Sequence, residues 1–305
     1  MSTPSPMEEL KAGLPDSMWG KILGATPIVM TVIATLLAGL SNSEMTKAQY
    51  ARALAAQQQS KAGDQWAFFQ AKRMRSAIQL STLDVVQFSE ISPQPDAAAL
   101  SAFAATMPDS ERVQAALAVL LSGKLPEAAR SAPPAREVQV VLDGMRISIP
   151  EEELIPLLNS AEPEAVVAAI RLAEADIRAF DEKLNPIIEG GDKLGEAIDA
   201  SGQQPLRRDF ARLRLGYSAM RYDAEAAMNR AVANLFEVQV RQSNLAAERH
   251  HRRSMRFFYG MLAAQAAVIV STFAMAARKR NLLWSLAAAA GVGAIGFAAY
   301  VFLYI

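Results

Sequence analysis

The side chains that most often carry catalysis are scarce in this sequence. It contains no cysteine, which excludes disulfides, thiolate metal sites and cysteine nucleophiles. Its two histidines, His250 and His251, are neighbours, and adjacent helical positions point about 100° apart, so they do not form an i, i+4 metal pair. Carboxylate chemistry through Asp64, Asp181 or Glu182 stays open, although nothing in the pattern singles them out. We expect no catalytic residue, no metal site, no cofactor and no enzymatic activity.

One glycine motif matches a nucleotide-binding pattern by letter, because residues 291–296 read GVGAIG. A dinucleotide site needs this loop after a strand, with an acidic residue about twenty positions later. Here the motif lies inside an apolar segment, where small residues let helices approach closely. We therefore expect close helix packing rather than nucleotide binding.

Aromatic and polar side chains are interleaved at residues 64–72, which read DQWAFFQAK. Two interpretations stay open. Either the polar groups around the aromatic rings form a binding site, or the rings pack inward while the polar groups face solvent or cap a neighbouring helix. The candidate interaction and packing residues are Asp64, Gln65, Trp66, Phe69, Gln70 and Lys72.

Cations gather at the edges of two apolar segments. Four arginines accompany the histidines just before residue 257, and three consecutive cations follow residue 277. Long basic side chains at a membrane edge extend toward the headgroups and attract anionic lipid. A pH-sensing or metal role for the histidines is the alternative. We expect lipid-headgroup contacts from Arg249, Arg252, Arg253, Arg256, Arg278, Lys279 and Arg280.

Three apolar segments are the elements that position these residues. Residues 22–40, 257–277 and 282–305 contain no charged side chain, and the basic loop 278–281 separates the last two. A helix of about 20 residues covers roughly 30 Å, the hydrocarbon thickness of a bilayer. We predict three transmembrane helices after an N-terminal tail at residues 1–21. A cleaved signal peptide is the competing interpretation of the first segment, and the long acidic stretch before it disfavours this.

The orientation of these segments is nearly balanced by charge. Cations flank the first segment on both sides, and more of them precede the second. Three cations in so short a loop resist translocation, which favours a cytoplasmic N-terminus and loop. Residues 42–256 would then lie outside the cytoplasm of a bacterial inner membrane.

The region between the first and second segments begins with a long helix. Its composition, rich in Ala, Gln, Glu and Lys, predicts helix over residues 42–91. Residues 92–160 predict a small inserted α+β subdomain of short helices separated by prolines. Alternation on both sides of Asp143-Gly144 predicts a β-hairpin at 138–149 within it.

Residues 161–256 predict a helical coiled-coil region continuous with the second apolar segment. Apolar residues repeat every seven positions from Phe210 to Leu245, as in a coiled coil. A second seam becomes polar at Asn234 and Arg241, either as a register or oligomer-state device or as a solvated face. The predicted fold class is mainly α: three transmembrane helices, long antiparallel helices continuous with them, and an inserted subdomain with one β-hairpin.

The run from Asp64 to Lys72, placed after an apolar segment, resembles a bacterial membrane family known as domain of unknown function 4337. The basic loop 278–281 and its His250-His251-Arg252-Arg253 lead-in are also similar to that family. The resemblance covers about residues 20–83 and 205–305, with 92–160 as an insertion. It implies a bacterial inner-membrane protein of this topology, and it implies no activity.

The empty catalytic inventory and the long pairing surfaces predict an integral membrane scaffold or interaction protein that self-associates. The alternative is an oligomeric channel or transport-complex component, which the lack of ionisable residues inside the apolar segments disfavours. The expected partners are a bilayer with anionic headgroups, further copies of the chain and an unidentified membrane protein. Because 31 basic residues balance 31 acidic ones, nothing draws the chain to nucleic acid.

Overall fold

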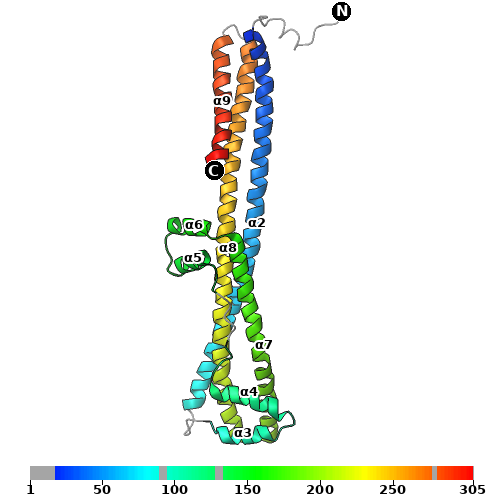
Figure 1. Cartoon of the computed structure of the whole chain (residues 1–305), viewed down its shortest axis with the longest axis vertical. Helices are drawn as coiled ribbons and strands as arrows, with labels where there is room; N and C mark the ends of the chain where they lie inside the picture. The colour runs from blue at the N-terminus through cyan, green and yellow to red at the C-terminus, as the bar shows by residue number, and fades with distance from the viewer. Residues whose placement is uncertain (1–17, 89–94, 128–132, 277–279, 305) are drawn as a thin grey trace, which may run out of the picture. The chain divides into compact units, whose positions relative to one another are not determined.

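The computed structural model describes residues 18–88, 95–127, 133–276 and 280–304. Every regular element among these residues is a helix (Figure 1). In chain order the helices are α2 (Met18–Phe88), α3 (Ala97–Ala105), α4 (Ser110–Ser122), α5 (Arg136–Arg146), α6 (Glu151–Ser160), α7 (Pro163–Ser201), α8 (Gln204–Ala276) and α9 (Arg280–Tyr304).

Two compact units share the two longest helices. The terminal unit comprises Met1–Ala55 and Ser243–Ile305, and the central unit comprises Ala56–Gln242. Helix α2 continues from the first apolar segment to Phe88 without a break at Gly63, and α8 continues into the second segment. The predicted continuity of both helices with the apolar segments is confirmed.

In the terminal unit, α2 and α8 run antiparallel and meet through small side chains. The Ser41 hydroxyl donates to the Ser254 carbonyl oxygen at 3.0 Å, and the Ser254 hydroxyl donates to the Ser41 carbonyl oxygen at 2.9 Å. Both serines are buried, so these reciprocal bonds satisfy the hydroxyls inside the interface.

Helix α9 packs on the same pair through glycine. A Cβ at Gly291 would overlap the end of the flexible Met30 side chain, which would have to shift, and a Cβ at Gly260 of α8 would lie 3.3 Å from Leu37 of α2. The packing interpretation of the glycine motif is therefore confirmed at Gly291, whereas a Cβ at Gly293 would meet nothing within 4 Å. Ala34, Phe257, Ala264 and Ala294 complete this core.

The prediction of three membrane spans is wrong. Among the described residues, two helices are long and apolar enough to cross a bilayer, namely α2 and α8. The described apolar part of α9 covers only Ser285–Gly296. Twelve helical residues rise roughly 18 Å, which is short of the roughly 30 Å of hydrocarbon. The loop residues 277–279 lie outside the described part of the chain.

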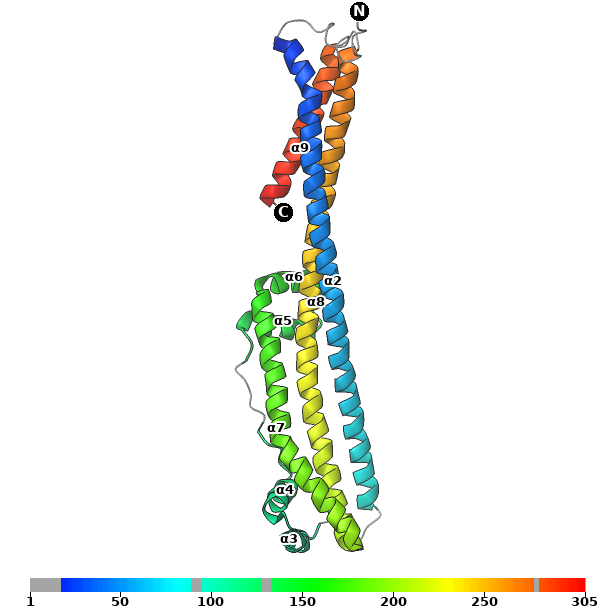
Figure 2. The ribbon, with the colours of Figure 1, turned by 90° about the vertical axis from the view of Figure 1, so that its right-hand side faces the viewer.

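In the central unit, α7 lies beside α8, and α4 crosses α7 (Figure 2). Leu117 and Leu120 of α4 pack with Phe180, Leu184 and Leu194 of α7 in one buried cluster that α8 completes. Glycine permits this crossing, because a Cβ at Gly190 would lie 2.6 Å from the Ala116 Cβ. Helix α7 runs through Gly190-Gly191 without a break.

The predicted β-hairpin at 138–149 is also wrong, since the segment forms helix α5, Arg136–Arg146. Val138, Val141 and Gly144 are its buried positions, and a spacing of three places them on one helical face. Gly144 lies in a close approach rather than in a turn, because a Cβ there would lie 2.9 Å from the Ile149 Cδ1, the end of a flexible side chain.

Candidate interaction site

The 64–72 segment places Trp66 and Phe69 against α8, whereas Phe68 is exposed. The Trp66 Nε1 donates to the Glu237 Oε1 at 2.7 Å, and the Trp66 ring meets the Phe69 ring edge-on, with 5.5 Å between centroids. One helical turn later the Ser76 hydroxyl donates to the Ala219 carbonyl oxygen at 2.9 Å. Trp66 and Phe69 therefore help to join α2 to α8 in the central unit.

The polar residues of the segment divide between the two faces of α2. Asp64 and Gln70 are exposed. Gln65 is half-buried, and its Oε1 has no hydrogen-bond partner among the described groups. Lys72 faces α8, where its Nζ forms an ion pair with Glu225.

Lys72 and Glu225 are part of a charged cluster between α2, α7 and α8. Arg221 lies 3.4 Å from Glu225, and the Lys72 ammonium lies 5.4 Å from the centroid of the Tyr222 ring. Burial raises the pKa of Asp181, and the nearby Glu225 charge raises this pKa further, against the opposing influence of Lys72 and Arg221. The cluster thus holds two carboxylates that compete for the same cations.

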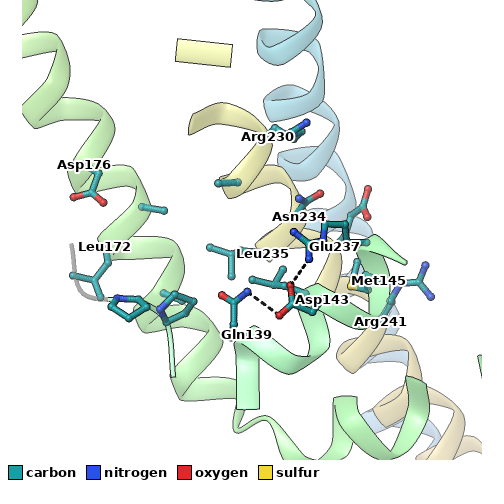
Figure 3. A pocket seen from close by; sticks show the side chains of 17 residues that line it. Gln139, Asp143, Met145, Leu172, Asp176, Arg230, Asn234, Leu235, Glu237 and Arg241 are labelled. Atoms are coloured by element: carbon teal, nitrogen blue, oxygen red, sulfur yellow. Dashed lines mark hydrogen bonds and ion pairs between the residues drawn. The ribbon is translucent and has the colours of Figure 1, made fainter. Parts of the chain in front are cut away.

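A cleft of about 680 Å³ opens between α5, α7 and α8 in the same unit (Figure 3). Apolar side chains such as Leu142, Met145, Leu172 and Leu235 form much of its wall. Both polar seam residues predicted on α8, Asn234 and Arg241, line it. The volume falls within the usual range of ligand sites.

The charges of the cleft are balanced. Three arginines and three carboxylates line it: Arg146, Arg230, Arg241, Asp143, Asp176 and Glu237. Asp143 accepts from the Gln139 amide at 3.2 Å and pairs with Arg146 at 3.3 Å. Among the described residues, no group of three or more acidic or histidine side chains is placed to hold a metal ion. The mixed lining suits a protein segment that carries both charges and apolar side chains.

The 64–72 segment and the cleft share two residues of α8. Glu237 lines the cleft and accepts from Trp66, while Arg230 lines the cleft and lies 6.0 Å from the centroid of the Phe69 ring. Trp66 and Phe69 of α2 therefore contact two of the six charged side chains that line the cleft, without lining the cleft themselves. The 64–72 segment and the polar seam residues Asn234 and Arg241, which the sequence suggested separately, belong to one structural site.

Sequence reasoning missed most of the cleft residues. Arg230, Asn234, Glu237 and Arg241 are spaced four, three and four residues apart, so they share one face of α8. That spacing was a usable signal. The contributions of α5 and α7 carried no comparable signal, since they depend on how the three helices pack.

The residues predicted to contact lipid headgroups have mixed surroundings. Arg249 and Arg252 are exposed, and Arg252 pairs with Glu248 one turn earlier on α8. Arg256 lies 5.2 Å from the centroid of the Tyr300 ring on α9, and Arg253 is half-buried. Arg278 and Lys279 lie outside the described residues, as does the side chain of Arg280, a residue that begins α9.

An ion pair unforeseen from the sequence lies in the terminal unit. His250 Nδ1 is 2.6 Å from Glu44 Oε2, and Lys47 binds the other carboxylate oxygen at 2.7 Å. Burial raises the pKa of Glu44, but the hydrogen bonds and charges of Lys47 and His250 outweigh it and bring the pKa below its usual value. Glu44 therefore keeps its charge and stabilises the pairing of α2 with α8.

Comparison with known families matches residues 19–134 to the model described as "Domain of unknown function (DUF4337)". This region of the chain is therefore similar to that family. The predicted resemblance is confirmed for the first apolar segment and the 64–72 segment, and the match extends into residues 92–134, which the sequence suggested as an insertion. It stops before residues 205–305, which were expected to be included. No curated protein and no solved structure matches the chain.

Proposed function

We propose that this chain is a membrane-anchored helical scaffold that acts through contacts with other proteins. One observation carries the proposal: α2 and α8 each run unbroken from a membrane-length apolar segment into a central unit that offers a cleft of balanced charge. A helix that belongs to both an anchor and a binding unit serves to position the binding unit, which is a scaffold role rather than a catalytic one.

The surroundings of the apolar segments support anchoring. Only 22% of the apolar window of α2 and 33% of that of α8 is buried, so neither helix is the core of a water-soluble unit. Ala34 and Leu37 of the first segment pack with Phe257 and Ala264 of α8. Because the first apolar segment packs into the core of the terminal unit, we favour a retained anchor over a cleaved signal peptide. We place the chain in a bacterial inner membrane with the central unit on the extracytoplasmic side, following the positive charge of the 278–280 loop.

The hydroxyl groups of these segments favour an anchor over a pore. Thr31 donates to the Pro27 carbonyl oxygen at 2.8 Å, and Thr35 donates to the Thr31 carbonyl oxygen at 2.9 Å. In α8, Thr272 donates to the Val268 carbonyl oxygen at 2.8 Å. Each hydroxyl is satisfied by its own helix, which suits a lipid environment and leaves it less available to line a water-filled path.

The test is site-specific photo-crosslinking of the full-length chain in its native membrane. A crosslinker at Arg241, which lines the cleft, is compared with one at Arg178, an exposed arginine of α7 outside it. We expect discrete protein adducts at Arg241 that are reduced at Arg178. A chain that yields no adduct with any protein at either position, and that purifies without a partner, would refute the scaffold proposal.

A further inference from the structure

Helix α2 carries a second long face within the central unit, opposite the one that contacts α8. Its inner face includes Ala62, Ser76 and Leu83. The opposite face presents seven uncharged residues, all exposed: Ala67, Ala71, Met74, Ile78, Ser81, Val85 and Phe88. We call this set the outer stripe.

The outer stripe has the spacing of a coiled-coil seam. Its intervals alternate four, three, four, three, four and three residues, so it follows the 3.5-residue period that brings two helices together along a seam. The large side chains of the stripe are well exposed, with Met74 at 66%, Ile78 at 55%, Val85 at 66% and Phe88 at 92%. A row of four large apolar side chains in water over about two heptads, 74–88, indicates a surface made for a partner helix.

We propose that the outer stripe is the site where a second copy of this chain binds, through parallel pairing of the two α2 helices. The inference rests on the proposed scaffold function and names one of its partners. Because α2 also carries the first apolar segment, two copies inserted in one membrane in the same orientation present α2 in parallel. Confinement to the membrane plane also raises their effective concentration.

The register of the stripe favours such a parallel pair. The spacing assigns Ala71, Ile78 and Val85 to the a positions and Met74, Ser81 and Phe88 to the d positions. Branched residues at a favour two-stranded parallel coiled coils. The stripe begins at Ala67, one turn after the exposed Asp64, whose charge would face its own copy at the preceding a position.

The flanking residues are compatible with the same arrangement. In a parallel pair, each g residue faces the e residue five positions later on the partner. Gln70 would then face Arg75, and Ala77 would face Thr82, so no like charges meet along the described seam. The cations on the inner side are already engaged, since Lys72 pairs with Glu225 and Arg73 pairs with Asp223.

The anchoring bilayer is a poor alternative cover for the stripe. Ala67 lies 27 residues after Leu40, the end of the first apolar segment, and both belong to the unbroken helix α2. A helical stretch of 27 residues is longer than the roughly 20 residues that cross a bilayer.

Cysteine cross-linking provides a direct test, because the natural chain has no cysteine and an introduced thiol is the sole one. The full-length variant S81C places the thiol at a d position of the stripe, whereas Q87C places it at an exposed position away from the seam. Under mild oxidation in membranes we expect a disulfide-linked dimer from S81C and at least a tenfold lower yield from Q87C.

Charge substitution provides the matched second test. Ile78 and Leu80 are similarly exposed, at 55% and 48%, but only Ile78 belongs to the stripe. In nanodiscs we expect I78E to reduce the dimer fraction at least tenfold and L80E to leave it unchanged, with equal helix content in both. Glutamate at Ile78 would place two like charges in the seam.

Each contrary outcome identifies what fails. A dimer that survives I78E, with S81C and Q87C linking equally, would overturn the stripe while leaving a scaffold that pairs by another face. A monomer that still gives protein adducts at Arg241 would overturn the stripe alone. A monomer without any adduct would overturn the stripe and the scaffold function together.

Discussion

Replacing Gly190 by alanine would add one methyl group at the crossing of α4 and α7. That methyl carbon would lie 2.6 Å from the Ala116 Cβ and 3.1 Å from the Arg112 carbonyl oxygen. Ordinary contacts between such atoms start near 3.4 Å, so α4 would have to move by close to 1 Å. Neither neighbouring atom is the far end of a flexible side chain, which means that no rotamer change relieves the overlap.

Two opposing effects determine the size of the change. Alanine is favoured over glycine by about 1 kcal/mol in a helix interior, whereas overpacking costs about 1–3 kcal/mol. The difference leaves a net loss of up to about 2 kcal/mol in the free energy of unfolding of the central unit for G190A. For a unit of nearly 190 residues this corresponds to a fall in Tm of up to roughly 8 °C.

Gly63 offers a matched control, because it also lies inside a long helix but a Cβ there would meet nothing within 4 Å. We expect G63A to raise the free energy of unfolding by up to about 1 kcal/mol. Thermal unfolding of the full chain by circular dichroism measures both variants. A second substitution, A116G, removes the opposing methyl and should make G190A less harmful, with a favourable coupling energy of about 1 kcal/mol. Finding G190A as stable as G63A, or no coupling to A116G, would refute this account of the crossing.

Three further predictions concern polar contacts. W66F removes the donor to Glu237 and should lower the free energy of unfolding by about 1–2 kcal/mol. Urea titration measures this. An unchanged midpoint of urea unfolding would contradict the role of the hydrogen bond. D181N should stabilise the central unit at neutral pH, because the raised pKa of Asp181 means that its charged form is disfavoured in the folded state. Thermal unfolding between pH 7 and pH 3.8 measures this. The difference in stability between D181N and the natural chain should shrink as Asp181 of the natural chain becomes protonated. E44Q should destabilise the terminal unit by about 1–2 kcal/mol at pH 7. The lowered pKa of Glu44 means that its charged form supplies stability above pH 4.5, and this stability is lost as the pH falls further. If E44Q is still less stable than the natural chain by the same amount at pH 3, the ion pair is not the cause.

Continuous helices were the most predictable part of this fold. The apolar segment at 22–40 and the Ala- and Gln-rich stretch after it carry compatible helical propensities, and no strong breaker lies between them. The same holds for α8 from Gln204 onward. Periodicity and composition are local properties, so a single sequence reports them well.

The errors came from residues whose role depends on distant partners. Asp143-Gly144 has the composition of a hairpin turn, yet Gly144 is a buried position of helix α5 and its bare face lies close to Ile149. Gly190-Gly191 looks like a helix end, yet the pair accommodates α4 across α7. Glycine is ambiguous in a sequence, since the same missing side chain serves a turn or a close approach, and only packing distinguishes the two.

The cleft shows how packing residues can position a surface to which they do not belong. Trp66 and Phe69 are held between α2 and α8, so they do not themselves offer a surface to a partner. Their contacts nevertheless set the positions of Glu237 and Arg230, which line the cleft on the other side of α8. Removing either ring should therefore alter cleft binding without removing any group that a partner touches. The family match covers these α2 residues and ends before α8.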